Sequence, residues 1–577
     1  MKKIFAILLS LAFCLVAAAR TISSEEALKY ASRFFDDAPE SDFNLVWTGS
    51  ETSAPSFYAF NKKNGGFIII SSENATVPVI GYSYSGAFSS NNMPENLKGW
   101  FNGLEKDLVM VRKDKLAQGS EVKSKWETIG IRTKGGEETF LLKTAEWDQG
   151  KPYNLLCTLP DNKKAVTGCV ATAMAIFLRH LGYPAHGTGY LNGYKTASKG
   201  YQIDGYSIDD HNYDWKSMPL SDEEVQKADE DVQKQIAQIM HDCGVAVKMD
   251  YTTNSSGATS LRIPEALSSH FGFSDSVAEY SRDLYDYPTW EAMLKNELKQ
   301  DRPVMYGGQD EGGAGGHQFI IDGFDGKGLW HVNWGWSGSN NGYYAINLSI
   351  PDKYAFSVSA TAILGAVPDP DKTKGEKMSQ IVLENTGIKL ISGEFASGKE
   401  FEINPNYIAN LGPADYNGKA VPALVAKDGT VLEKISEPQD LEVLGTSGSS
   451  YYYKSGLKFI CRTNKTLNFG DGVMMMYLVP GTEDEYALMP YNHDGTRGKL
   501  TAIPMFIKMN KQKYSEGDIF ECDIEGGSEP VSSAKWYYDG KKVIGRIIQL
   551  TKGTHEIKAV VVCGDKTYNI FQEISVN

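Results

Sequence analysis

Cys169 has the greatest potential for chemistry in this sequence, because it stands where a turn-prone stretch meets a strongly patterned helix. Residues 163–168 form that stretch, and apolar residues then recur at helical spacing as far as Leu181. Gly182 and Pro184 are typical of a helix end. A thiol in the first turn faces unpaired backbone N–H groups and the positive end of the helix dipole, which both favour the thiolate. The pattern predicts a nucleophile, and a buried structural cysteine is the plain alternative.

A thiolate that attacks carbonyl groups needs an imidazole to share its proton and a polar group to hold that imidazole. His317 follows the glycine-rich run 312–316 and opens an apolar strand, and Asn333 ends a second strand-like run. They lie 148 and 164 residues after Cys169, which is the chain order and separation of papain-like enzymes. We expect the amide oxygen of Asn333 to accept a hydrogen bond from His317, and the neighbouring Trp334 to shield that bond from water.

Three segments together resemble the streptopain family of papain-fold cysteine peptidases. They are Thr-Gly-Cys-Val-Ala-Thr-Ala-Met-Ala at 167–175, Gly-Gly-His at 315–317 and His-Val-Asn-Trp-Gly-Trp at 331–336. The cathepsin signature Cys-Gly-Ser-Cys-Trp is absent, and the resemblance covers about residues 20–365. It implies a papain-like α+β catalytic domain.

The same resemblance assigns Gln149 to the oxyanion hole, together with the backbone N–H of Cys169. Two such donors could stabilise the charge that develops on the attacked carbonyl oxygen. For Gln149 the alternative is a solvent-facing side chain in a turn, and for Trp334 it is a plain place in the core.

His331 competes with His317 for the role of general base, because it also lies near Asn333. It precedes Asn333 by two residues on the same predicted strand, so both side chains share one face. We therefore expect a packed histidine at 331. His180 lies too far along the cysteine helix to meet the thiol, and His186 lies beyond the end of that helix.

Metal binding is the other chemical function to consider from the sequence. His241 and Cys243 have a spacing that could hold a metal, but a zinc site needs more ligands than these two. We expect neither a metal nor an organic cofactor.

Composition and the N-terminus indicate an exported globular protein. The net charge of -14 over 577 residues argues against nucleic acid and against anionic membranes as partners. Two lysines, the apolar run 4–16 and Ala17-Ala18-Ala19 are typical of a secretory signal peptide over residues 1–19. We expect no membrane span in the remaining chain, because no later stretch approaches 18 uninterrupted apolar residues.

The rest of the chain divides by pattern into four parts. Residues 20–136 read as an α+β pro-segment with a polar activation linker from about 113, where few buried contacts are expected, and a permanent accessory domain is the alternative. Residues 137–366 form the papain-like domain, and 367–375 form a linker. Residues 376–505 read as a β-sandwich module. Residues 506–577 read as an immunoglobulin-like sandwich, in which Cys522 and Cys563 flank Trp536 and are expected to form a disulfide.

The sequence thus predicts a secreted bacterial cysteine endopeptidase made as a zymogen, which cleaves proteins or peptides and is inhibited by its own pro-segment. The C-terminal modules are expected to bind a surface or a protein. A transglutaminase or amidase on the same fold is the first alternative, although such an enzyme would usually have an aspartate at position 333. A non-catalytic surface adhesin is the second.

Overall fold

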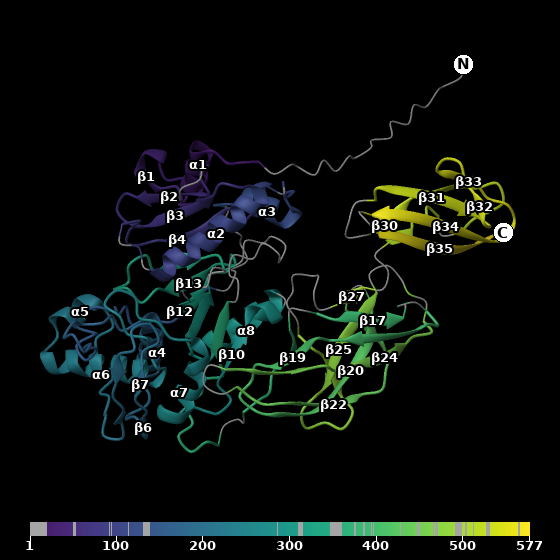
Figure 1. Ribbon diagram of the computed structural model, residues 1–577. Helices are drawn as coiled ribbons and strands as arrows, with labels where there is room; N and C mark the ends of the chain where they lie inside the picture. Colours follow the sequence, from purple (N-terminus) through teal and green to yellow (C-terminus); the bar gives the residue numbers. More distant parts are fainter. Residues whose placement is uncertain are drawn as a thin grey trace. The chain divides into compact units, whose positions relative to one another are not determined.

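A computed structural model of the protein divides the chain into two units (Figure 1). The first comprises Met1–Gln380, Leu411–Asp415 and Gly445–Tyr452, and the second comprises Ile381–Asn410, Tyr416–Leu444 and Tyr453–Asn577. The structure describes residues 20–49, 54–91, 93, 95–113, 115–130, 139–285, 287–309, 316–346, 360–373, 377–384, 387–393, 395, 397–426, 429–446, 450–465, 467, 471–490, 499–501, 505–511, 513–526, 531–563 and 566–577. The predicted signal peptide lies outside these residues.

The predicted pro-segment is a small α+β unit, as expected from its pattern. Helix α1 (Ser24–Phe34) opens with a capping box between Ser23 and Glu26. Strands β1 (Phe43–Trp47), β2 (Phe57–Lys62), β3 (Phe67–Ser71) and β4 (Val79–Ser83) follow as an antiparallel meander, and α2 (Glu95–Lys113) and α3 (Ser120–Glu127) complete the unit.

Helix α3 corrects one expectation about the polar segment that begins near residue 113. Val122 and Trp126 are buried, and the Trp126 indole N–H donates to the carbonyl of Thr76 at 2.8 Å. Two apolar residues four apart lie on one face of a helix, and this pair is enough to fix the segment to the pro-segment core. The chain packed against the pro-segment core therefore extends further than predicted, and residues 131–138 lie outside the described chain.

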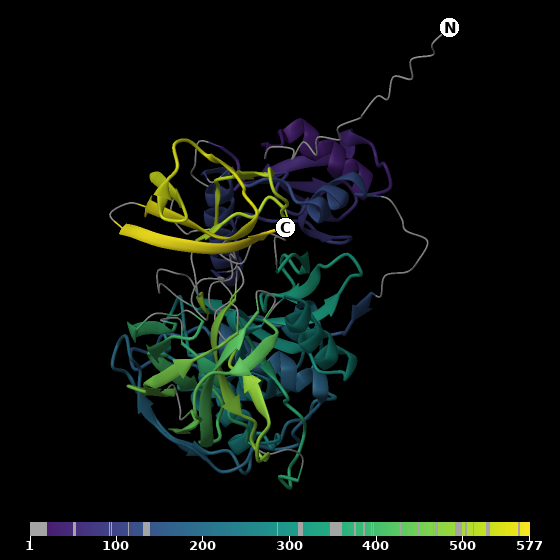
Figure 2. The same ribbon diagram turned by 90° about the vertical axis from the view of Figure 1, so that its right-hand side faces the viewer.

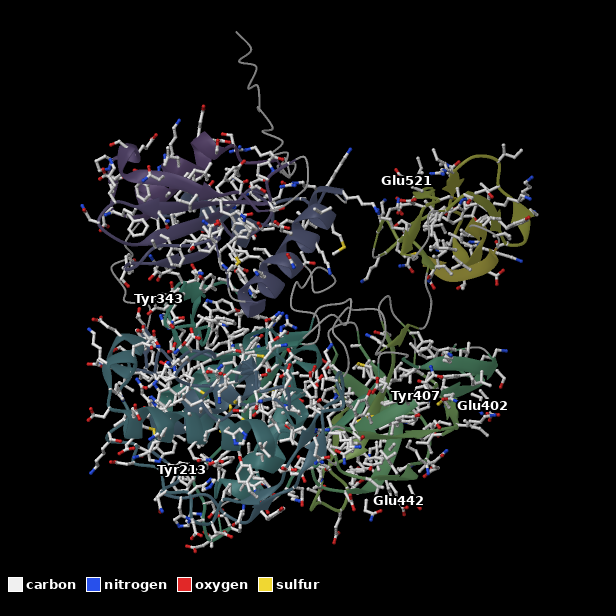
Figure 3. The ribbon with its side chains drawn as sticks, turned by 60° about the vertical axis from the view of Figure 1, so that its left-hand side comes forward. Tyr213, Tyr343, Glu402, Tyr407, Glu442 and Glu521 are labelled. Atoms are coloured by element: carbon white, nitrogen blue, oxygen red, sulfur yellow. The ribbon has the colours of Figure 1, made fainter. Side chains whose placement is uncertain are left out.

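One antiparallel sheet continues from the pro-segment into the predicted catalytic region. Its order is β1-β2-β3-β4-β14-β13-β12-β11-β15-β10, and the joint lies where Tyr343 and Tyr344 of β14 pair with Tyr82 and Gly81 of β4. The Tyr82 and Tyr343 rings stack at 5.1 Å (Tyr343 in Figure 3). The catalytic strands are β10 (Ala278–Ser281), β11 (Val304–Gln309), β12 (Gly316–Phe324), β13 (Trp330–Asn333), β14 (Gly342–Tyr344) and β15 (Thr361–Leu364), with β5 (Phe140–Leu141) beside β12.

Helices pack against the catalytic strands and supply a large part of a second core. Helix α4 (Cys169–Leu181) packs against α6 (Glu230–Ala246) and against β11 and β12. The other helices are α5 (Asp222–Lys227), α7 (Ile263–His270) and α8 (Tyr287–Lys299), and two short ribbons pair β6 (Tyr190–Leu191) with β9 (Tyr206–Ser207) and β7 (Tyr194–Lys195) with β8 (Gln202–Ile203). Among the described residues, no helix combines the length and the apolar character needed to cross a membrane.

The second unit is built from β-strands, as predicted for the tail. Around one core lie three sheets: β16 (Ile381–Leu383), β19 (Tyr407–Asn410) and β23 (Tyr452–Ser455); β17 (Lys389–Gly393), β18 (Glu400–Asn404) and β24 (Phe459–Arg462); and β20 (Tyr416–Val425), β21 (Val431–Lys434), β22 (Gln439–Val443), β25 (Gly472–Leu478), β26 (Tyr486–Leu488) and β27 (Leu500–Thr501). The α+β class with a β-rich C-terminal region is therefore confirmed.

The last strands form their own core, drawn in yellow in Figures 1 and 2. They are β28 (Met505–Ile507), β29 (Ile519–Glu521), β30 (Ile524–Gly526), β31 (Ser533–Tyr538), β32 (Lys541–Lys542), β33 (Ile547–Gln549), β34 (Gly553–Cys563) and β35 (Lys566–Val576). Cys522 and Trp536 are buried there as predicted, but Cys522 is a free thiol, so the predicted disulfide is wrong. Strand β29, which leads to Cys522, pairs with β33, whereas Cys563 ends β34 at its hairpin with β35.

Candidate active site

Cys169 is the first residue of α4, at the start of a helix whose bounds agree with the predicted ones. Gly168 precedes it with φ of 89°, and a β-carbon there would lie 2.6 Å from the sulfur of Met249. A residue with a side chain would be strained and crowded at this position, so glycine sets the approach of the backbone to Cys169. Residues 170–178 are all buried, which fixes the helix in the catalytic core.

The thiol of Cys169 is less acidic than the sequence predicts. Burial raises its pKa above the ordinary value, while backbone N–H groups of Gln318, Val170 and Cys169 itself act in the opposite direction. Desolvation disfavours a charged sulfur, and in this structure it outweighs the helix terminus. The expected thiolate is therefore not favoured while the pro-segment is in place.

His317 is the second residue of β12 and lies on the face of that strand that carries Phe319 and Ile321. Its imidazole lies directly against α2 of the pro-segment. A β-carbon added to Gly99 would stand 2.4 Å from Cδ2 and 2.6 Å from Nε2 of the ring. The glycine run before His317 falls largely in residues 310–315, outside the described chain.

Asn333 ends β13 and is 1% exposed. Its amide nitrogen donates to the hydroxyl of Thr144 at 3.0 Å and to the carbonyl of Ala145 at 2.9 Å, and its amide oxygen accepts from the N–H of Gly335 at 3.1 Å. An amide oxygen can accept two hydrogen bonds. The predicted bond from His317 is compatible with the second of them.

Trp334 is buried among aromatic rings that come from both regions of the first unit. Its ring lies 4.8 Å from Phe319 and 5.3 Å from Tyr344, and 6.3 Å from Trp100 of α2. The same Trp100 meets Tyr344 edge-on at 5.3 Å. Helix α2 thus touches two of the predicted site residues, His317 and Trp334.

Gln149 is 4% exposed, so the alternative of a solvent-facing side chain is wrong. Its carbonyl accepts from the N–H of Thr167 at 3.0 Å, which places it beside the approach to Cys169. Asp148 holds this turn, because its carboxylate accepts from the backbone N–H groups of Gln149 and Gly150 and from the hydroxyl of Ser337.

His331 is a half-buried histidine on the strand of Asn333, and its Nδ1 lies 2.5 Å from Oδ1 of Asp322. His180 contacts the carbonyl of Lys143 and the carboxylate of Asp301. Across the described chain, no three histidine, cysteine or acidic side chains gather as a metal site would require.

Sequence reasoning missed several residues that the structure brings to the site. Gly99 and Trp100 give no signal by themselves, because only the packing of α2 places them there. Asp322 does give one: it is an acidic residue inside an apolar strand, and a buried carboxylate requires partners. Those partners are His331 and Thr144.

Family models match the two regions separately. The peptidase C10 family matches residues 147–344, and a model described as Spi protease inhibitor matches residues 19–108.

Two relatives are similar over longer stretches. The thiol protease/hemagglutinin PrtT of Porphyromonas gingivalis is 30% identical over 406 residues, which is 65% of this chain and 45% of that protein. Streptopain of Streptococcus pyogenes is 31% identical over 348 residues, which is 57% of this chain and 83% of that protein. The chain therefore spans less than half of the first relative and most of the second.

Two solved structures from Prevotella intermedia are also similar. A prointerpain A fragment is 27% identical with a TM-score of 0.47 and matches over 57% of this chain and 99% of its own. Active interpain A cysteine protease is 32% identical with a TM-score of 0.36 and matches over 40% of this chain and 95% of its own. Given the family model over residues 147–344 and the identity to streptopain over most of its length, the chain belongs to the peptidase C10 family of cysteine peptidases.

Proposed function

We propose that the protein is a secreted cysteine endopeptidase, synthesised as a zymogen whose own pro-segment keeps it inactive. The observation that carries the proposal is the position of Cys169 at the start of α4, a helix that packs on strand β12, whose second residue is His317. A nucleophile at a helix terminus and an imidazole on the adjacent strand are the two parts that thiol peptidases require.

Each site residue has a distinct role in the proposed reaction. The sulfur of Cys169 attacks the peptide carbonyl carbon, and the imidazole of His317 takes the thiol proton and later gives it to the leaving amine. Asn333 orients the imidazole and Trp334 shields their contact. The side chain of Gln149 and the backbone N–H of Cys169 donate to the oxyanion. Water then hydrolyses the acyl-enzyme.

Latency follows from the contact between α2 and His317. Because Gly99 lies against the ring, the imidazole occupies the face of β12 that the pro-segment covers, while Ile320, on the other face, packs in the core of α4. In this proposal, the pro-segment holds the imidazole on that face and so limits its access to the thiol of Cys169. The raised pKa of the thiol is consistent with this inactive arrangement.

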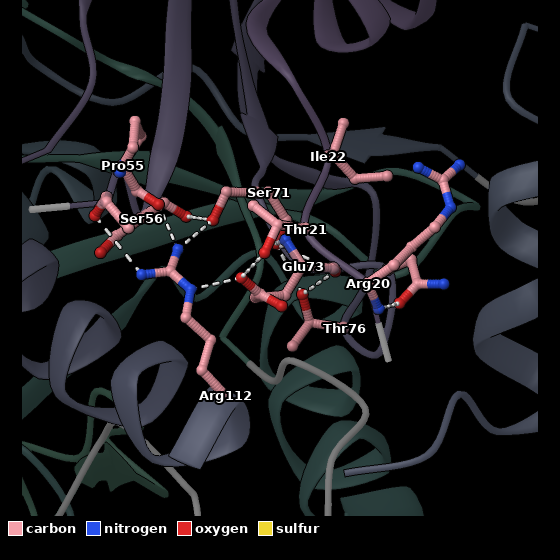
Figure 4. A network of polar contacts seen from close by, with 12 residues as sticks. Arg20, Thr21, Ile22, Pro55, Ser56, Ser71, Glu73, Thr76 and Arg112 are labelled. Carbon is pink, nitrogen blue, oxygen red and sulfur yellow. Dashed lines mark hydrogen bonds and ion pairs between the residues drawn. The ribbon is translucent and has the colours of Figure 1, made fainter. Parts of the chain in front are cut away.

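The far end of α2 is fixed by a partly buried ion pair (Figure 4). The guanidinium of Arg112 donates to the carboxylate of Glu73, to the carbonyl of Pro55 and to the hydroxyl of Ser72, and the Glu73 side chain is 2% exposed. Removing one partner of such a pair would leave the charge of the other without its partner. These bonds therefore hold the helix firmly on the pro-segment sheet.

Activation is proposed to need a cut between Gly130 and Thr139. The chain is packed as far as Ile129, which is 8% exposed, and Leu142 further along is bonded to the carbonyl of Asp322. The sequence between them is mostly polar and contains Gly135-Gly136, a composition typical of protease cleavage sites. In this scheme residues 20–136 are removed, 137–366 form the peptidase, and the modules 376–505 and 506–577 bind a surface or a protein, the last with an immunoglobulin-like arrangement.

A fluorogenic peptide assay tests the function. Purified full-length zymogen should be inactive, become active after limited proteolysis, and lose activity with a thiol-directed inhibitor. Cys169→Ala should be inactive under all conditions, since loss of a triad nucleophile removes many orders of magnitude in rate.

Three other results would contradict the proposal. Acyl transfer to amines without peptide hydrolysis would point to a transglutaminase, and release of ammonia alone would point to an amidase. No turnover at all, together with tight binding to cell surfaces, would point to an adhesin.

A further inference from the structure

Four polar side chains, three of them buried, form a continuous hydrogen-bonded chain that includes the proposed catalytic asparagine. Asp322 of β12 contacts Nδ1 of His331 with one oxygen and accepts from the hydroxyl of Thr144 with the other. Thr144 in turn accepts from the amide nitrogen of Asn333 at 3.0 Å. Thr144, Asp322 and Asn333 are 7%, 2% and 1% exposed. Sequence patterns gave no role to Thr144 or Asp322.

The direction of every bond in this chain follows from the charge of Asp322. A carboxylate only accepts hydrogen bonds, so the Thr144 hydroxyl must donate to it. The hydroxyl oxygen is then left as an acceptor, and it faces the amide nitrogen of Asn333. The carbonyl of Ala145, which also only accepts, takes the second amide hydrogen at 2.9 Å.

Both amide hydrogens of Asn333 are therefore committed, and only its oxygen remains for other partners. A flipped amide would point its oxygen at the carbonyl of Ala145 and leave two acceptors in contact. Burial makes such a mismatch costly. An asparagine that orients an imidazole must present its oxygen, and not its nitrogen, to a ring N–H. The chain of hydrogen bonds therefore selects the orientation of the Asn333 amide in which the oxygen can accept that bond.

His331 holds the carboxylate in place. Its Nδ1 lies 2.5 Å from one oxygen of Asp322, and the other oxygen accepts from the Thr144 hydroxyl. This gives the second histidine a purpose that does not involve proton transfer to substrate.

We propose that Thr144 and Asp322, supported by His331, are positioning residues that fix the amide of Asn333 so that its oxygen faces His317 in the mature enzyme. The inference deepens the proposed function, since it presumes that Asn333 orients the catalytic imidazole. Thr144 acts only through Asn333 and touches no reacting atom.

A double-mutant cycle on activated enzyme tests the inference. Thr144→Val keeps the size and removes the hydroxyl, and it should lower kcat about tenfold with little change in KM. Thr144→Ser keeps the hydroxyl and should restore most of the activity. In an Asn333→Ala background, Thr144→Val should have no further effect on kcat, because its target is already absent.

Thr196→Val is the matched control. Thr196 is 3% exposed, its hydroxyl accepts from the N–H of Tyr201, and it lies outside the network. This variant should lose some thermal stability and no kcat. If Thr144→Val does not fold, Thr144→Cys repeats the cycle with a weak hydrogen-bonding group of similar size.

The outcomes separate this inference from the proposed function. If wild-type enzyme shows no thiol-dependent hydrolysis, the proposed function fails and the cycle has no baseline. If wild type is active and Thr144→Val matches it, or if the effects of Thr144→Val and Asn333→Ala simply add, the positioning role is wrong while the peptidase assignment stands.

Discussion

At the scale of single residues, the reactivity of Cys169 depends on its surroundings more than on its place at a helix terminus. The helix start favours the thiolate, but the larger effect of burial raises the pKa of the thiol. Under the proposed function, removal of the pro-segment would rehydrate the site and let His317 pair with the sulfur. Both changes favour the thiolate.

We therefore predict that Cys169 is alkylated by iodoacetamide at neutral pH about tenfold faster, or more, after activation than in the zymogen. Cys157, Cys243, Cys461 and Cys522 are buried and serve as internal controls, because their labelling should stay low in both forms. Mass spectrometry of labelled peptides measures each site. Equal rates at Cys169 in the two forms would contradict the argument.

His331 supplies a prediction about pH. Burial disfavours its charged form, but the Asp322 carboxylate outweighs this effect, with a smaller contribution from Glu146, and the net result raises the pKa of His331. A histidine whose pKa is raised on folding stabilises the folded protein at pH values below its unfolded-state pKa of about 6.5. This stabilisation is lost as the pH rises through the pKa of the histidine in the folded state.

The loss in melting temperature caused by His331→Gln should thus be larger at pH 6 than at pH 8.5. The Cys169→Ala background prevents self-cleavage during the measurement. The same loss at both pH values would show that the imidazole is not charged in the folded protein.

At the scale of elements, α2 has a sequence suited to lying across a strand end. Gly99 lets the helix backbone reach the His317 ring, and Trp100 beside it fills the space next to Trp334. Gly99→Ala improves helix propensity but inserts a methyl group into the imidazole. Overpacking of this kind lowers the free energy of unfolding by about 1–3 kcal/mol.

We expect Gly99→Ala zymogen to process itself about tenfold faster than wild type, because the inhibitory contact is weakened by that overpacking. Asn102→Ala is the control, since Asn102 is exposed on the same helix and gains helix propensity without crowding a buried contact. Time courses of conversion on gels compare the three. Slower self-processing of the Gly99→Ala zymogen would mean that α2 supports the fold and does not inhibit the peptidase through its contact with His317.

Local patterns were sufficient to predict the elements that hold the predicted site residues, and insufficient to predict the partners of those elements. The helix from Cys169 to Leu181 and the strands around His317 and Asn333 could be predicted because periodicity and end signals are local. The contact of α2 with His317, the burial of Trp126 and the bonds of Thr144 depend on residues far apart in the chain. The failed Cys522 disulfide has the same cause: strand pattern gives the phase of a side chain but not the strand opposite it.

At the scale of the whole first unit, one apolar core crosses the boundary between pro-segment and peptidase. It includes Phe57, Leu97 and Phe101 on one side and Trp330, Trp334 and Tyr344 on the other. A single cut of the chain removes none of these contacts. Cleavage and release are therefore separate events.

We predict that a specific protease site placed within residues 131–138 of the Cys169→Ala protein gives two fragments that stay associated. They should co-elute in gel filtration under native conditions and separate in moderate urea. Separate elution without denaturant would show that the shared core is too weak to hold the pro-segment.

The joint between β4 and β14 also bears on how the enzyme is made. The pro-segment meander leaves the ribosome first, so we expect β4 to be formed before β14 pairs with it and to act as a template for the catalytic sheet. Once that template has been degraded, an unfolded mature chain has lost the partner of β14. We expect mature enzyme to refold poorly after denaturation and to recover when separate pro-segment is added. Its working lifetime would then be governed by how slowly it unfolds, and not by an equilibrium with the unfolded state.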